Sequence, residues 1–172
     1  MPAAVFNAAA DDPVTRFFKA VENGDAATVG AVLKETPAAA AWTKPVAPGD
    51  LPWGREETAL MLAAGAGHTA VMKQLIDAGA LLNAQQHRGW TALMYAANRN
   101  REGAVDLLLS YGADTKLANE QGDTAATVAA RRQDYTLVKK INAALGSHGV
   151  RFFEGSKTAL PAPPTARFRR KI

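Results

Sequence analysis

The chain contains no cysteine in its 172 residues. Disulfide bonds, thiolate metal ligands and cysteine nucleophiles are therefore excluded, and a secreted disulfide-rich fold finds no support. Long apolar runs are also missing, since none approaches the roughly 20 residues that a helix needs to cross a bilayer. The first ten residues carry no basic group of the kind that opens a secretory signal, and Asp11 follows at once. We expect a soluble protein that is cytoplasmic or otherwise intracellular, although a chain already trimmed of a signal would read the same.

Proline is missing from most of the chain, because none of the nine prolines lies between Trp53 and Leu160. Proline interrupts helix interiors, so its absence marks this stretch as the regular part of the molecule. The 37 alanines favour helices that approach one another closely. An excess of one charge sign is confined to the last 27 residues, which carry six basic side chains and one acidic side chain. The formal net charge of +4 therefore belongs mostly to the tail, and the rest of the chain is nearly neutral.

A seven-residue pattern recurs through the regular part of the chain. Residues 58–64 read TALMLAA, residues 91–97 read TALMYAA and residues 124–130 read TAATVAA, with a step of 33 residues each time. Gly79 and Gly112 keep the same step. So many positions in register predict a repeat architecture.

Each unit has the residues expected of two short helices joined by a turn. Its threonine is suited to cap the first helix, because the side-chain oxygen accepts hydrogen bonds from N–H groups that have no partner there. In the second helix Met72, Leu75 and Ile76 fall at i, i+3 and i+4 and form one apolar stripe. Gly79 and Gly112 stand where a left-handed residue ends such a helix. This pattern predicts an all-α fold.

With these features the sequence resembles the ankyrin-repeat family, most closely at residues 57–89 and 90–122. The family's usual T-P-L-H opening reads Thr-Ala-Leu-Met here, and its Gly-His pair is kept only at Gly67-His68. An earlier, degenerate unit is indicated by Pro13, which suits the first turn of a helix, and by an apolar stripe that includes Phe17. We expect a solenoid of about four helix-turn-helix units, with a long Pro-rich insertion after the first unit and a basic C-terminal tail.

The repeats set the expected boundaries along the chain. An insertion is expected because Gly24 precedes Gly67 by 43 residues, ten more than one period. The expected parts are an N-terminal extension (1–11), a degenerate capping repeat (12–35), the insertion (36–57), two ankyrin repeats (58–90 and 91–123), a C-terminal capping repeat (124–146) and the tail (147–172).

One segment imitates a dinucleotide-binding fingerprint, because residues 65–70 read G-x-G-x-x-A after an apolar run. A true fingerprint follows a strand, whereas this run is expected to be the first helix of a repeat. The histidines show no metal-ligand spacing, and no serine lies in a G-x-S-x-G motif. His68 stands at the family's turn position, where a hydrogen-bonding role is expected. We therefore expect no catalytic, cofactor-binding or metal-binding residues, no small-molecule substrate and no enzyme activity.

The resemblance implies partner contacts from the hairpin tips between repeats and from the concave face of the first helices. Trp90 and the arginines are the residue types that most often dominate interface energies. Arg99 and Arg132 lie one period apart and are expected to form a basic stripe, although arginine near a helix C-terminus is equally explained by the helix dipole. The candidate contacts on the array are His87, Arg88, Trp90, Arg99, Asp123 and Arg132, beside Glu57, Asn98, Glu120, Gln121 and Arg131.

The insertion and the tail supply further candidate contacts. Trp42 and Trp53 make the insertion too apolar for a solvated linker, so that it either folds back over the array or binds a partner as a clamp, and the two outcomes are compatible. In the tail, Arg167, Arg169 and Arg170 surround Phe168 and are expected to bind an acidic surface, although basic termini are often only solvated.

Taken together, the sequence predicts a non-catalytic protein–protein interaction module. We expect an adaptor or a subunit of a larger assembly that binds one principal protein partner and does not contact membranes. The alternative is an RNA- or ribonucleoprotein-associated subunit that uses the basic tail and the Arg99/Arg132 stripe.

Overall fold

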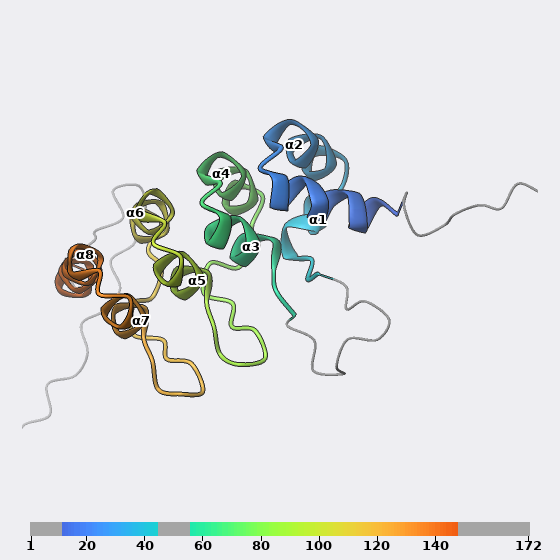
Figure 1. Ribbon diagram of the computed structural model, residues 1–172. Helices are drawn as coiled ribbons and strands as arrows, with labels where there is room; N and C mark the ends of the chain where they lie inside the picture. Colours follow the sequence, from blue (N-terminus) through green and yellow to red (C-terminus); the bar gives the residue numbers. More distant parts are fainter. Residues whose placement is uncertain (1–11, 45–55, 148–172) are drawn as a thin grey trace, which may run out of the picture.

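The computed structural model describes residues 12–44 and 56–147, and these fold into paired helices (Figure 1). A short 3-10 helix, Pro37–Ala41, follows the first pair. The pairs are α1 (Pro13–Asn23) with α2 (Ala26–Glu35), α3 (Ala59–Ala66) with α4 (Thr69–Asp77), α5 (Ala92–Asn98) with α6 (Glu102–Ser110), and α7 (Ala125–Arg131) with α8 (Tyr135–Ser147). Within the described ranges the only extended pairing is an isolated bridge between Thr43 and Thr58, so the expected all-helical fold is confirmed.

The helices form two rows (Figure 1). The first helices α1, α3, α5 and α7 pack side by side in one row, and the second helices α2, α4, α6 and α8 pack in the other. The connections from α4 to α5 and from α6 to α7 project as loops on the side of the first helices. Each unit packs mainly against its neighbours, which is the architecture of a solenoid.

A threonine caps the first helix of each of the last three units, as the sequence predicted. The side-chain oxygens of Thr58 and Thr91 each lie 3.3 Å from the N–H nitrogen three residues on, and that of Thr124 lies at 3.4 Å. All three threonines have extended backbone angles. The three positions are therefore equivalent in structure as well as in sequence. In the first unit, aspartates take the same role, because Asp12 caps α1 and Asp25 caps α2.

The core follows the predicted apolar stripes. Small alanines of the first helices, among them Ala63 and Ala96, are fully buried and let neighbouring first helices approach closely. Larger side chains fill the space between the rows, and the largest that are fully buried include Phe17, Leu60, Met61, Met72, Leu75, Leu93, Met94, Leu108, Leu137 and Ile141. The segment that imitates a dinucleotide fingerprint is helix α3 followed by a turn, so the strand that such a site requires is replaced by a helix.

The turn inside each unit contains one residue with a left-handed backbone. Gly67 takes this position after α3 with φ of 86°, but the equivalent residues in the next two units are Asn100 (φ 53°) and Gln133 (φ 62°). Asparagine tolerates this conformation better than most residues, whereas glutamine has no such preference. The turn of the last unit is therefore strained compared with that of the second.

His68 joins two units instead of stabilising only its own turn. Its Nε2 lies 2.9 Å from the carbonyl oxygen of Glu22, near the end of α1, so Nε2 carries the proton and donates it to that carbonyl. Arg101, one period later, donates from Nε to the carbonyl oxygen of Gly65 near the end of α3 at 3.3 Å. The hydrogen bond expected for His68 is present, and its partner is in the preceding unit.

We predict that Gln133→Gly raises the free energy of unfolding by about 0.5–1 kcal/mol. The left-handed conformation costs a residue with a Cβ about 1–2 kcal/mol, and the extra freedom of glycine in the unfolded chain cancels part of the gain. Urea unfolding followed by circular dichroism measures the change. Gln133→Ala is the matched control, because it removes the same side chain but keeps the Cβ. Equal stability of the two variants would contradict the explanation.

Candidate protein-interaction surface

Two hairpins connect the last three units and have the same internal structure. In the α4–α5 hairpin (residues 85–90), the N–H of Gln86 donates to the carbonyl of Trp90 at 3.1 Å, and in the α6–α7 hairpin (residues 118–123), the N–H of Asn119 donates to the carbonyl of Asp123 at 2.9 Å. The side-chain oxygens of Gln86 and Asn119 also accept backbone N–H groups within their own turns. Both amide side chains are buried, so each turn is stabilised by hydrogen bonds from its backbone to a side chain in its interior.

The two hairpins are also bonded to each other. The N–H of Glu120 donates to the carbonyl of Arg88 at 3.1 Å. Gln85 bridges the same pair, because its Nε2 donates to the carbonyls of Gly89 and Ala118, both at 3.0 Å. The tips are thus held at a fixed distance from one another before any partner binds.

A related hairpin base connects the first two units. The N–H of Lys44 donates to the carbonyl of Glu57 at 2.8 Å, which corresponds to the bond between Gln86 and Trp90. Glu57, Trp90 and Asp123 are separated by one period each, and each precedes a capping threonine. The described ends of the expected insertion therefore join the array through the same kind of base as the later hairpins.

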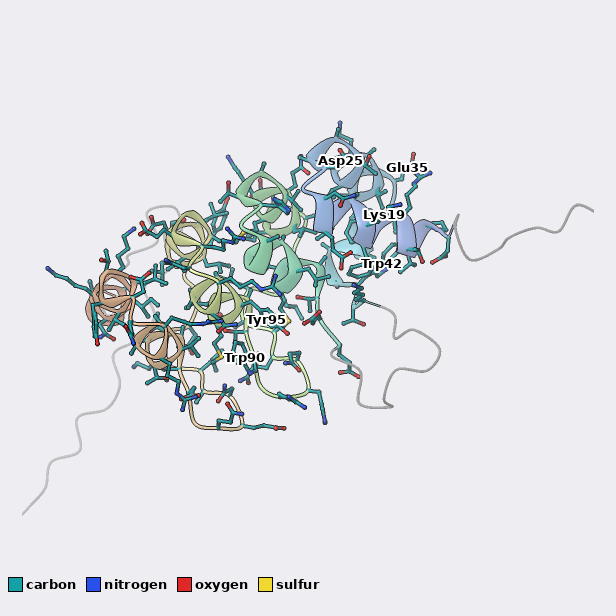
Figure 2. The ribbon with its side chains drawn as sticks, viewed as in Figure 1. Lys19, Asp25, Glu35, Trp42, Trp90 and Tyr95 are labelled. Carbon is teal, nitrogen blue, oxygen red and sulfur yellow. The ribbon has the colours of Figure 1, made fainter. Side chains whose placement is uncertain are left out.

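Trp90 and Tyr95 form an aromatic pair beside α5 (Figure 2). Their ring centroids are 5.6 Å apart with an interplanar angle of 66°, an edge-to-face contact, and both side chains are half-buried. The hydroxyl of Tyr95 donates to Oε1 of Glu57 at 2.6 Å. Glu57 is only 8% exposed, so its carboxylate has little access to water and needs a hydrogen-bond donor from the protein. The hydroxyl of Tyr95 is such a donor. The aromatic pair is thereby fixed to the preceding unit.

The arginines of this region have different surroundings. Arg131 forms a salt bridge with Asp123, whose side chain is 8% exposed. Arg132 donates from Nε to Oδ1 of Asn98 at 3.1 Å. Arg99 lies along the preceding helix, where a Cβ on Gly65 would be 3.6 Å from its Cδ. Arg99 and Arg132 are both exposed.

The structure places the sequence-predicted contacts in different environments. His87 and Arg88 are exposed at the tip of the α4–α5 hairpin, and Trp90 is half-buried at its base. Asp123 is buried and already paired, so it serves the scaffold. Trp42 packs edge-to-face on Phe17 of α1, with ring centroids 5.5 Å apart. At this residue the expected insertion therefore folds back on the array. Trp53, Arg167, Arg169 and Arg170 lie outside the described residues.

Three residues of this surface were missed in the sequence. Gln86 and Asn119 stand one period apart, and this shared position is a signal for a structural amide in the turn. Tyr95 replaces the aliphatic Leu62 and Val128 of the neighbouring units, so an exception to the repeat pattern marks it. Its partner Glu57 is 38 residues away in the sequence.

The arrangement offers shape and hydrogen bonds for recognition. Within residues 12–44 and 56–147, no group of three histidine, cysteine or acidic side chains is placed to hold a metal ion. None of the helices in that part of the chain combines the length and hydropathy needed to cross a bilayer. A shallow hollow of about 410 Å³ lies between α1 and α2, away from the hairpins, and is lined partly by Lys19, Asp25 and Glu35 (Figure 2).

Comparison with known families identifies the repeat. A family model described as "Ankyrin repeats (3 copies)" matches residues 17–119 and, in an overlapping match, residues 60–150. Among curated proteins, no sequence matches this chain.

We predict that Tyr95→Phe lowers the free energy of unfolding by about 1–3 kcal/mol, because a hydrogen bond to a buried carboxylate is lost. Combining it with Glu57→Gln in a double-mutant cycle isolates the coupling between the two side chains, measured by urea unfolding. Tyr135→Phe is the control, since Tyr135 is 72% exposed and its loss of a hydroxyl should leave stability unchanged. A coupling energy near zero would show that the bond contributes nothing.

Proposed function

The chain belongs to the ankyrin-repeat family, and we propose that it is an adaptor or a subunit of a larger assembly that binds a protein partner. Ankyrin repeats are generally protein–protein interaction modules, and the family is typically non-catalytic. The partner contacts the hairpin tips and the concave face of the first helices, with His87, Arg88, Trp90 and Arg99 at the centre. We place this interaction inside the cell, as the composition predicts.

The observation that supports this proposal best is the bonding between the two hairpins. Glu120 is held to Arg88 through backbone atoms, and Gln85 bridges both loops. Loops that are ordered before binding lose less conformational entropy when a partner docks. The tips therefore hold His87 and Arg88 in a fixed position. A loop that served only to connect two helices would not need these bonds to the next hairpin.

The size of the array favours one principal partner. A standard interface occupies about 800 Å² on each protein, and the described array consists of four helix pairs, a small scaffold for several partners at once. In this proposal the insertion (36–57) and the basic tail (147–172) act as auxiliary arms that contact the same partner. Trp53 in the insertion and Arg167, Arg169 and Arg170 in the tail are the residues proposed to do so.

Charge supports a second candidate function, association with RNA or a ribonucleoprotein. The residues that the structure describes carry thirteen basic and thirteen acidic side chains, so the excess positive charge of the chain lies elsewhere, chiefly in the tail. Binding of that kind loses affinity steeply as salt rises. A tail variant in which Arg167, Arg169 and Arg170 are replaced by glutamine tests this candidate separately from the concave face.

We predict that His87→Ala/Arg88→Ala reduces recovery of the partner at least fivefold, since hot-spot side chains contribute more than about 1 kcal/mol each. The full-length chain is used as bait in cells of its own organism, and partners are quantified by mass spectrometry. Both residues are exposed, so stability should change by less than about 0.5 kcal/mol.

The matched control is Lys73→Ala/Lys139→Ala, which removes two exposed basic side chains from the second helices α4 and α8. The control should recover the partner as the unmodified chain does. If both double variants recover it equally, the hairpin tips are not the binding surface.

A further inference from the structure

Helices α5 and α7, each taken with the residue after it, carry basic side chains and no acidic ones, whereas α3 carries no charged residue. Helices α3, α5 and α7 with the residue that follows each contain three arginines and neither aspartate nor glutamate. Arg131 is neutralised by Asp123, whereas no salt bridge within the described ranges involves Arg99 or Arg132. Among the described residues, two exposed guanidinium groups on this row therefore have no carboxylate partner.

Arg99 and Arg132 are the C-cap residues of α5 and α7 and complement the dipoles of these helices, but this interaction leaves their hydrogen-bond donors available. At the end of α3, Arg101 already donates to the carbonyl of Gly65, while the stem of Arg99 only lies over that glycine. At the end of α5, Arg132 donates to the side-chain amide of Asn98 and not to a backbone carbonyl. Since a guanidinium has five N–H donors, most donors of Arg132 remain for a ligand.

The two arginines occupy equivalent positions in adjacent units, so their spacing follows the helix packing. They are 33 residues apart, each directly after a first helix. Packed helices lie about 8–10 Å apart. A polyproline II segment advances 3.1 Å per residue with three residues per turn, so side chains at i and i+3 lie on one face about 9 Å apart. The spacing expected between adjacent first helices is therefore close to the spacing of side chains on one face of a polyproline II segment.

An aromatic surface lies beside this pair of charges. A Cβ on Gly65 would be 3.6 Å from both Tyr95 Cδ1 and Arg99 Cδ, which places the ring next to the arginine stem. Trp90 packs on Tyr95 and is half-buried. Proline rings of an extended peptide dock on aromatic side chains of this kind.

Resting on the proposed function above, we propose that the partner binds through an extended, acidic, proline-containing segment whose carboxylates recur at every third residue. Successive carboxylates pair with Arg99 and Arg132, and the intervening prolines pack on Tyr95 and Trp90. The described residues carry equal numbers of basic and acidic side chains, so the array as a whole offers no excess positive charge to a nucleic acid.

The test uses the full-length chain and a fluorescein-labelled 12-residue peptide with the repeat Glu-Pro-Pro. A peptide of the same composition with the repeat Glu-Glu-Pro-Pro-Pro-Pro is the control for spacing, and a 12-nucleotide polyuridylate is the probe for nucleic acid. Fluorescence anisotropy at low and at physiological salt gives the dissociation constants. We expect Glu-Pro-Pro to bind at least fivefold more tightly than the control peptide at low salt.

The double variant Arg99→Gln/Arg132→Gln should weaken binding of the Glu-Pro-Pro peptide about tenfold, because each exposed charge pair contributes up to about fivefold. Lys73→Gln/Lys139→Gln removes the same charge from the second helices and should leave binding unchanged. Equal binding of the two peptides, or no loss in the arginine variant, overturns the proposal. Tighter binding of polyuridylate than of the peptide, lost in the arginine variant, overturns it in favour of nucleic acid.

A third variant, Arg167→Gln/Arg169→Gln/Arg170→Gln, identifies binding through the tail. If this variant alone loses the peptide, the array does not hold it and the proposal fails. Failure here is distinct from failure of the proposed function, because a partner that is still captured through His87 and Arg88 leaves that function standing.

Discussion

Each unit of this protein buries its apolar residues between its own two helices and against the units beside it, and the remaining features depend on this stacking. The alanines of the first helices bring α3, α5 and α7 close enough for their side chains to reach across to a neighbour. Three side-chain hydrogen bonds join neighbouring units: His68 binds Glu22, Arg101 binds Gly65, and Tyr95 binds Glu57. These hydrogen bonds orient one unit on the next, while burial of the apolar stripes supplies most of the stabilisation.

The repeat pattern accounts for what the sequence predicted well. The capping threonines, the left-handed glycines and the apolar stripes depend on interactions within a few residues, so their positions can be derived from local chemistry. The family resemblance rests on the same positions, and the family match covers residues 17–119 and 60–150. Tyr95 was missed, although it stands where the neighbouring units have the aliphatic residues Leu62 and Val128.

The polar partners were harder to predict because they lie about one period away in the sequence. Asp123 and Glu57 have the residue type and position of surface contacts, yet both are buried with a partner. Whether an arginine reaches a carboxylate depends on its rotamer and on the size of the neighbouring residue. Gly65 leaves room for Arg99 to lie flat, whereas Asn98 in the next unit offers Arg132 an oxygen. A sequence pattern records equivalent positions but not these differences between them.

The hairpin base between Lys44 and Glu57 has a consequence for how this protein can change over evolution. Its backbone bond closes the chain at the same place as the shorter turns of later units, so the helices on either side meet regardless of what the base encloses. Closing a flexible loop grows more costly only with the logarithm of its length, by about 0.6 kcal/mol for each doubling. The sequence between these two residues can therefore be lengthened, shortened or replaced while the stacking of the units stays as it is.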